Sequence, residues 1–312
     1  MKGRAASLLS VARESPARVA VHDRPGWLSL FSQDAVVEDP VGAAAHRRQR
    51  SRSDDPLRRF YDTFIGPNRV DMDTRLDVVH SQQAEVARDV IIHTQLQTGL
   101  SIDVHAYLLY QLTEEQGQLR IARLAAHWEL PQMSLQVLGR GLKGLWTMTQ
   151  MSWHMLRVLG VGGTLGYMQA MTSGVFGHGR RTIEALSAAL SERRTQVLGR
   201  LFADHAQLEL SDGTVPTAES PASIHSASDR QASMGAALPA LLALVPADHT
   251  FVVSSPRASG HTVAFRFAIS HRDGTPGPHG IGFCEFTPTG FFRRKNAKIQ
   301  RLRLFISHDG IV

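Results

Sequence analysis

One short stretch of the sequence, Asp34 to Gly42, carries residues that could do acid–base chemistry. Its apolar residues predict a strand over Ala35–Asp39 that stops at the following proline. Side chains alternate between the faces of a strand, so Glu38 and Asp39 point in opposite directions and one of them faces the interior. A carboxylate at the end of an apolar strand has a raised pKa and can act as a base near neutral pH. An acid before proline also caps turns, so a purely structural role stays open.

Other common catalytic signatures are missing. The sequence has no His-Glu-x-x-His, no Cys-x-x-Cys and no Gly-x-Ser-x-Gly, and its 15 histidines are scattered. The glycines of residues 160–166 miss the dinucleotide-binding spacing by one residue and follow a helical pattern where a strand is required. The single thiol, Cys284, lies in a strand-like segment and is predicted to be a small core residue. We expect neither a metal site nor a cofactor.

The elements before residue 130 predict an α+β layout. A helix is expected over Val19–Phe31 and a second over Leu57–Ile65, with a polar loop between them after the strand. From Met72 to Trp128 the apolar residues recur with period two, which is typical of strands. Helices followed by a run of antiparallel strands are characteristic of the α+β class.

Residues 131–180 have a helical pattern instead. Leucines and methionines recur at helical spacing, and 22 uncharged residues lie between Arg157 and Arg180. Seven glycines and several polar residues in that run argue against a membrane-spanning helix, so we expect no integral membrane insertion. Helices packed between two domains, a helix in contact with a membrane surface, and a Met-rich cover over an apolar ligand all fit the pattern.

The last third of the chain echoes the first. Residues 201–213 align with residues 30–42, and residues 298–302 align with residues 120–124. The simplest interpretation is a tandem duplication of one α+β unit: a first domain at 1–130, a helical connector at 131–180 and a second copy at 181–312. The alignment sets Leu210 at the place of Asp39, so the second copy lacks the candidate base.

Charge and composition narrow the class of protein. The 312 residues carry a formal charge of +6, but residues 1–130 sum to −1 and residues 131–312 to +7. Six basic residues lie between Arg293 and Arg303 without an acid, which fits either an anionic partner or a solvated hairpin tip. One cysteine, a mean hydropathy of −0.14 and the lack of an apolar run near the N-terminus predict a cytoplasmic protein of two domains.

The sequence resembles the ketosteroid isomerase and SnoaL-like branch of the nuclear transport factor two-like superfamily. The resemblance is good over residues 15–130 and looser over 181–312. The residues that carry it, in the family's order, are Phe31, Asp34-Ala35, Val37-Glu38-Asp39-Pro40-Val41-Gly42, Phe60-Tyr61, Arg120-Ile121 and Trp128. It implies two cone-shaped domains, each a curved antiparallel sheet wrapped on helices around an apolar cavity, paired within the chain or as a homodimer.

The resemblance also implies roles for individual residues. Asp39 falls on the catalytic base of the ketosteroid isomerases, and Tyr61 falls on a tyrosine that supports their oxyanion site. The main donor tyrosine of the family falls near Ser15, and the place of its protonated aspartate falls near Leu108. The residues expected to contact ligand are Trp27, Phe31, Tyr107, His127 and Trp128.

Two functions follow from these expectations. In the first, the N-terminal cavity binds a small apolar carbonyl compound, of steroid or polyketide type, and Asp39 transfers a proton without a cofactor, as in an isomerase or cyclase. In the second, the same fold is a non-catalytic module for ligand binding or assembly. The departures at Ser15 and Leu108 leave both open.

Overall fold

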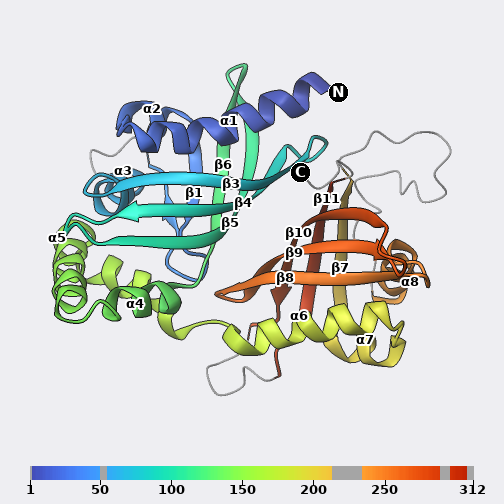
Figure 1. Ribbon diagram of the computed structural model, residues 1–312. Helices are drawn as coiled ribbons and strands as arrows, with labels where there is room; N and C mark the ends of the chain where they lie inside the picture. The colour runs from blue at the N-terminus through green and yellow to red at the C-terminus, as the bar shows by residue number, and fades with distance from the viewer. Residues whose placement is uncertain (1, 50–54, 213–233, 289–295, 308–312) are drawn as a thin grey trace. The chain divides into compact units, whose positions relative to one another are not determined.

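The computed structural model describes residues 2–49, 55–212, 234–288 and 296–307 and divides the chain into two compact units, Met1–Ser173 and Gly174–Val312 (Figure 1). Both units combine helices with one sheet, which confirms the predicted α+β class. The charged segment of Arg293, Arg294 and Lys295 lies outside the described residues.

The first unit begins with helices and continues with long strands. Its elements are α1 (Lys2–Ala20), α2 (Arg24–Ser29), β1 (Phe31–Glu38), β2 (His46–Arg47), α3 (Pro56–Phe60), the π-helical turn η1 (Tyr61–Ile65), β3 (Arg69–His80), β4 (Glu85–Gln95), β5 (Ser101–Glu115), β6 (Gln118–His127), α4 (Leu130–Leu138) and α5 (Leu142–Thr172).

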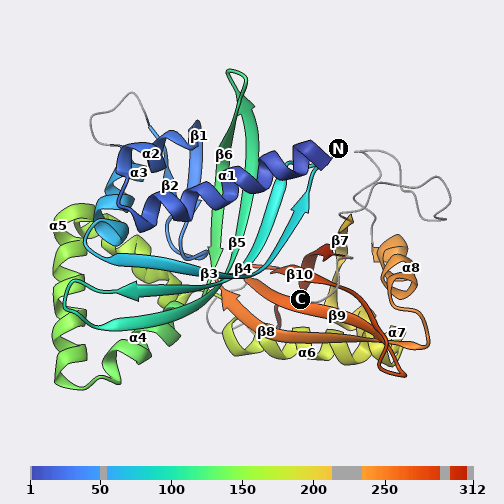
Figure 2. The ribbon, with the colours of Figure 1, turned by 45° about the horizontal axis from the view of Figure 1, so that its top comes forward.

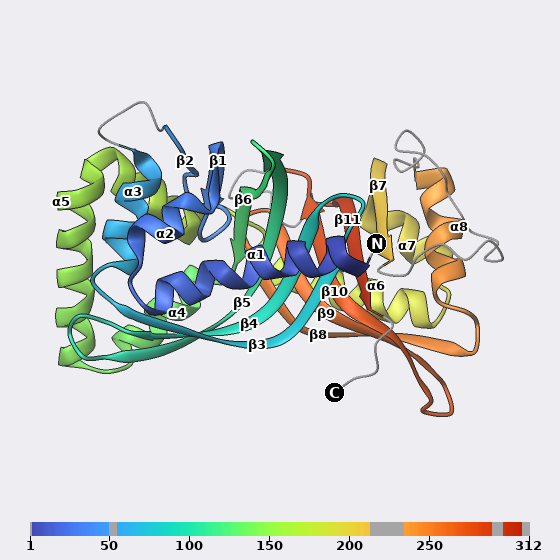
Figure 3. The ribbon, with the colours of Figure 1, turned by 90° about the horizontal axis from the view of Figure 1, so that it is seen from above.

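The sheet of the first unit has the order β2-β1-β6-β5-β4-β3. All pairs are antiparallel except β1 with β6, which are parallel. Register shifts interrupt the pairing at Thr74/Leu76 and at Gln111/Leu112, and such bulges bend strands. Figure 2 shows β3, β4 and β5 bending along their length, and α1 crosses the sheet (Figure 3).

The sequence predicted a helix within Val19–Phe31 with Pro25 well placed at its start, and the structure has a helix there with narrower bounds. α1 ends at Ala20, α2 begins at Arg24, and Phe31 is already the first residue of β1. Asp23 caps α2 by accepting a hydrogen bond from the Gly26 amide at 2.9 Å, and Pro25 occupies the first turn. The cap and the proline therefore begin the helix near Pro25, as the sequence indicated, whereas the residues up to Ala20 belong to α1.

Helices α4 and α5 belong to the first unit. Met133 and Val137 of α4 and Met155 and Tyr167 of α5 are buried in the same core as the sheet, and the unit boundary follows at Ser173. This division differs from the expected connector at 131–180, because the helices bury their apolar sides against one sheet. Within the described residues no helix is both long and apolar enough to cross a membrane.

The second unit has its own core. Its elements are α6 (Phe176–Ser191), α7 (Thr195–Leu201), β7 (Phe202–Asp212), α8 (Met234–Leu244), β8 (His249–Ser259), β9 (Thr262–His271), β10 (Pro276–Phe286) and β11 (Ile299–Ser307). The sheet order is β7-β11-β10-β9-β8, with β7 parallel to β11 and the other pairs antiparallel. Cys284 is fully buried in this core, as the sequence predicted.

Candidate functional site

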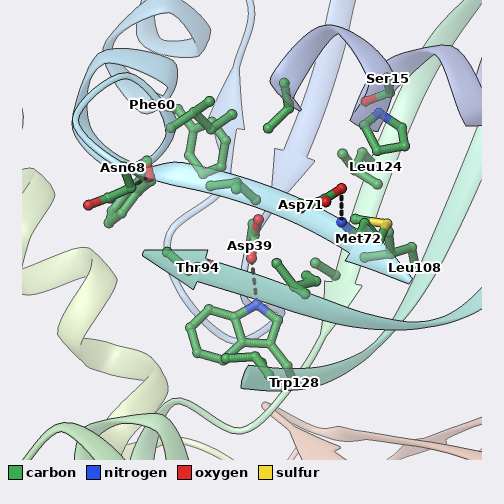
Figure 4. A pocket seen from close by; sticks show the side chains of 18 of the residues that line it. Ser15, Asp39, Phe60, Asn68, Asp71, Met72, Thr94, Leu108, Leu124 and Trp128 are labelled. Atoms are coloured by element: carbon green, nitrogen blue, oxygen red, sulfur yellow. Dashed lines mark hydrogen bonds between the residues drawn. The ribbon is translucent and has the colours of Figure 1, made fainter. Parts of the chain in front are cut away.

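A cavity of about 170 Å³ lies inside the first unit, between the sheet and the helices (Figure 4). Its wall is mostly apolar, with a few polar groups at separate places. The polar or aromatic residues that line it are Ser15, Trp27, Asp39, Phe60, Phe64, Asn68, Asp71, Thr94, Tyr110, Trp128 and Tyr167. An apolar chamber with a few fixed polar groups is the usual form of a small-molecule site.

Asp39 and Trp128 meet because their strands end side by side. Asp39 directly follows β1 and Trp128 directly follows β6, and these two strands pair in parallel with Glu38 opposite Ala125. The indole Nε1 of Trp128 donates a hydrogen bond of 2.5 Å to Oδ1 of Asp39 (Figure 4). The pairing of β1 with β6 therefore brings together two residues that are 89 positions apart.

Burial sets the chemistry of Asp39. Removal of the carboxyl from water raises its pKa from 3.8 to about 6, and the hydrogen bond from Trp128 partly opposes this rise because it favours the ionised form. A carboxyl with such a pKa is ionised in most molecules at neutral pH and still accepts a proton readily. This is the property that a general base requires.

The structure decides which of the two adjacent carboxylates faces inward. Glu38 points to the other side of β1, where Oε2 accepts a hydrogen bond of 2.6 Å from Nε of Arg123 on β6. Asp39 lines the cavity. The alternation predicted from the sequence is therefore present, and Asp39 is the inward member of the pair.

Tyr167 is a member of the cavity wall that no sequence pattern singled out. α5 breaks at Gly160, where φ is +71° and ψ is −179°, and the segment after the break carries Tyr167 into the unit. Its ring stacks on Phe64 with centroids 4.8 Å apart. Burial raises the pKa of its hydroxyl, and the nearby Asp39 carboxylate raises it further. Helical spacing indicated that this segment was packed, but no local signal indicated its partner.

Tyr61, the expected oxyanion donor, lies behind the cavity wall. Its ring contacts Trp27 at 5.4 Å between centroids, and its hydroxyl is buried without a hydrogen-bond partner among the described residues. Phe31 also packs on Trp27, at 4.5 Å, and is fully buried outside the cavity lining. Trp27 itself lines the cavity, and its Nε1 donates to Oγ of Ser15 at 3.1 Å.

Tyr107 and His127 lie on the opposite face of the sheet from the cavity. They are register partners on β5 and β6, and the residues that flank them, Leu108 and Ala126, line the cavity. Because side chains alternate along a strand, a neighbour of a cavity residue points away from it. On the cavity face of β5, Tyr110 is fully buried.

The polar groups away from Asp39 include Asn68 and Asp71, at the start of β3. Asp71 is exposed, and its Oδ1 accepts a hydrogen bond of 2.8 Å from the Met72 amide (Figure 4). A smaller cavity of about 40 Å³ shares Asn68 and Met151 with the main one. We interpret this side as the one open to solvent.

The first unit is thus an α+β domain with a mostly apolar cavity, and the partly buried carboxylate of Asp39 lies in the wall of that cavity. No family model matches the chain, and no curated protein matches it. Among solved structures it is similar to RV0760c from Mycobacterium tuberculosis in complex with estradiol-17beta-hemisuccinate, with 25% identity over 41% of this chain and 96% of that one and a TM-score of 0.35.

Two further solved structures are similar over the same share of the chain. Delta 5-3-ketosteroid isomerase from Mycobacterium sp. is 28% identical over 40% of this chain and 95% of its own, with a TM-score of 0.35. A computationally designed 17-OHP binder is 23% identical over 41% of this chain and 95% of its own, also with a TM-score of 0.35.

Proposed function

We propose that the first unit binds a small apolar carbonyl compound and that Asp39 moves a proton between two of its carbons. The observation that carries this proposal is a partly buried carboxyl that accepts a hydrogen bond from Trp128 and lies in the wall of an otherwise mostly apolar cavity, where loss of solvation raises its pKa to about 6. Burying an ionisable group without an ion-pair partner is costly, and such groups concentrate at functional sites.

The proposed reaction is the shift of a double bond in a β,γ-unsaturated ketone. The Asp39 carboxylate removes a proton from the carbon between the carbonyl and the alkene, and the electron pair moves onto the carbonyl oxygen to form a dienolate. The protonated Asp39 then returns the same proton to the γ-carbon, which yields the conjugated α,β-unsaturated ketone. No atom or electron is gained or lost, so the reaction needs no cofactor.

The dienolate oxygen needs a hydrogen-bond donor. Tyr167 lines the cavity close to Asp39, whereas Tyr61 lies behind Trp27. We therefore propose Tyr167 as the donor in place of Tyr61. Loss of one such donor typically lowers the rate by about 100-fold to 1,000-fold. Tyr167→Phe is expected to show that loss, and Tyr61→Phe, the matched variant, is expected to retain the rate.

The proposal is tested with two β,γ-unsaturated ketones, a 3-oxosteroid and the monocyclic 3-cyclohexenone, by following the ultraviolet absorbance of the conjugated product. Asp39→Asn keeps the size of the side chain and removes the base, so we expect the rate to fall by about 100-fold to 10,000-fold. Asp34→Asn, which removes an exposed carboxylate of β1 outside the cavity lining, is the control. Turnover that survives Asp39→Asn contradicts the mechanism.

The second candidate is ligand binding without turnover. It is favoured by the hydrogen bond from Trp128, which already occupies Oδ1 of Asp39 at 2.5 Å and fixes the carboxylate against the wall. In this case both ketones quench the emission of the buried Trp27 and Trp128 in a saturable way, and no conjugated product forms on long incubation. Product formation by the wild-type chain that is lost in Asp39→Asn excludes this alternative.

We also propose that the two units arose by duplication. In each unit the first strand along the chain pairs in parallel with the last strand of that unit. A glutamate near the end of the first strand forms an ion pair with an arginine of the last strand, Glu38 with Arg123 and Glu209 with Arg303. Leu210 is 38% exposed and stands at the place of Asp39. The expected ligand stoichiometry is therefore one per chain, measured by titration calorimetry.

A further inference from the structure

The first segment of α5, residues 142–159, is apolar on two sides. One side is buried against the core of the first unit and includes Met151, which lines the cavity, and Met155. The other side carries a stripe of large apolar residues that are exposed. The stripe consists of Leu142, Leu145, Trp146, Trp153 and Leu156.

The stripe follows helical geometry. Leu142, Trp146, Trp153 and Leu156 are separated by four, seven and three residues, so they lie on one narrow face at 3.6 residues per turn. Trp146 and Trp153 are 60% and 62% exposed. Exposure of large apolar side chains such as tryptophan to water is energetically unfavourable. An exposed apolar patch of several such side chains is typical of a binding surface.

The charged side chains that α5 itself carries are all positive. No aspartate or glutamate occurs between Glu129 and Glu184, whereas Lys143 and Arg157 flank the stripe on α5. The guanidinium of Arg157 lies 5.7 Å from the centre of the Trp153 ring. A helix face of apolar and tryptophan side chains with cations beside it can bind a partner that has an apolar interior and negatively charged groups at its surface.

We propose that this face of α5 docks on an anionic phospholipid surface, with the stripe among the acyl chains and Lys143 and Arg157 at the phosphates. The helix lies in the plane of the interface and does not cross it, which agrees with the absence of a spanning helix among the described residues. In the first unit α5 stands as a column at one edge, beyond the strands (Figure 1), and the side chains of the stripe are exposed. The inference is independent of whether Asp39 catalyses a reaction.

The experiment uses the full chain and sedimentation with vesicles of phosphatidylcholine alone or mixed with phosphatidylglycerol. We expect binding to the anionic vesicles and little to the neutral ones. Each cation near an anionic surface contributes about fivefold to partitioning, so Lys143→Ala with Arg157→Ala weakens binding by on the order of tenfold or more. Trp146→Ser with Trp153→Ser weakens it at least as much. Val252→Ser, an exposed apolar residue of the second unit, is the matched control.

Tryptophan emission gives a second readout. Trp27 and Trp128 are buried, so a blue shift on addition of anionic vesicles reports Trp146 and Trp153. Equal binding to both vesicle types, no binding, or unchanged binding by the tryptophan variant overturns the proposal. A dimer in light scattering that the same variant dissolves also overturns it, because the face would then be covered by a second copy of the chain.

Discussion

Replacement of Asp39 by asparagine should make the first unit more stable at high pH. The side chain keeps an oxygen that accepts the hydrogen bond from Trp128, but it has no proton to lose. In the wild-type protein the folded pKa of about 6 lies above the ordinary value of 3.8, so the folded state holds the proton more tightly than the unfolded chain does. The contribution of Asp39 to stability therefore falls as pH rises through this window.

The magnitude follows from the two pKa values. Ionised Asp39 costs the folded protein about 3 kcal/mol relative to an ordinary aspartate, and most of this cost arises between about pH 4 and about pH 6. The free energy of unfolding of Asp39→Asn minus that of the wild type should thus increase by about 2 kcal/mol between about pH 4 and about pH 8. Other titrating groups cancel in this difference because both proteins carry them.

The assay is equilibrium unfolding in urea followed by tryptophan emission. All four tryptophans, at positions 27, 128, 146 and 153, lie in the first unit, so the signal reports the unit that contains Asp39 and is silent about the other. Asp71→Asn removes an exposed carboxylate of the same kind and controls for the loss of charge alone. A difference between Asp39→Asn and the wild type that stays flat with pH refutes the reasoning, since a solvated carboxylate carries no such cost.

Two further predictions concern the groups around this site and the core. The rate of the proposed isomerisation by the wild type should rise through about pH 6 as Asp39 ionises. Trp128→Phe should move the midpoint of this pH profile upward, because it removes the hydrogen bond that favours ionised Asp39. A midpoint that is the same in Trp128→Phe and the wild type contradicts this role of the hydrogen bond. Arg88→Met should cost about 3 to 5 kcal/mol in urea unfolding, because it leaves the buried Asp77 carboxylate without its 2.7 Å partner. Arg13→Met, which removes a 59% exposed partner of the same carboxylate, should cost less than about 1 kcal/mol, and equal losses from the two arginines would show that burial does not govern these pairs.

The local sequence pattern was sufficient to predict the strands and the side-chain faces in much of the first unit. Period-two alternation along β5 placed Leu108 and Tyr110 on one face and Tyr107 on the other, and the structure has this arrangement. The same rule shows why Tyr107 could not line the cavity once the inward face was known. What alternation cannot supply is which face is inward, since that depends on the helices that cover the sheet.

The sequence by itself determined the α+β class, the strand that ends next to Asp39 and the opposite orientations of Glu38 and Asp39, because each depends on residues close together in the chain. Only the tertiary structure decided that Tyr167 enters the cavity and that Tyr61 does not. Their positions depend on the break at Gly160 and on packing against Phe64 and Trp27, which are contacts between distant segments. The loss of solvation that raises the pKa of Asp39 likewise depends on the sheet and the helices that surround its side chain in the folded unit.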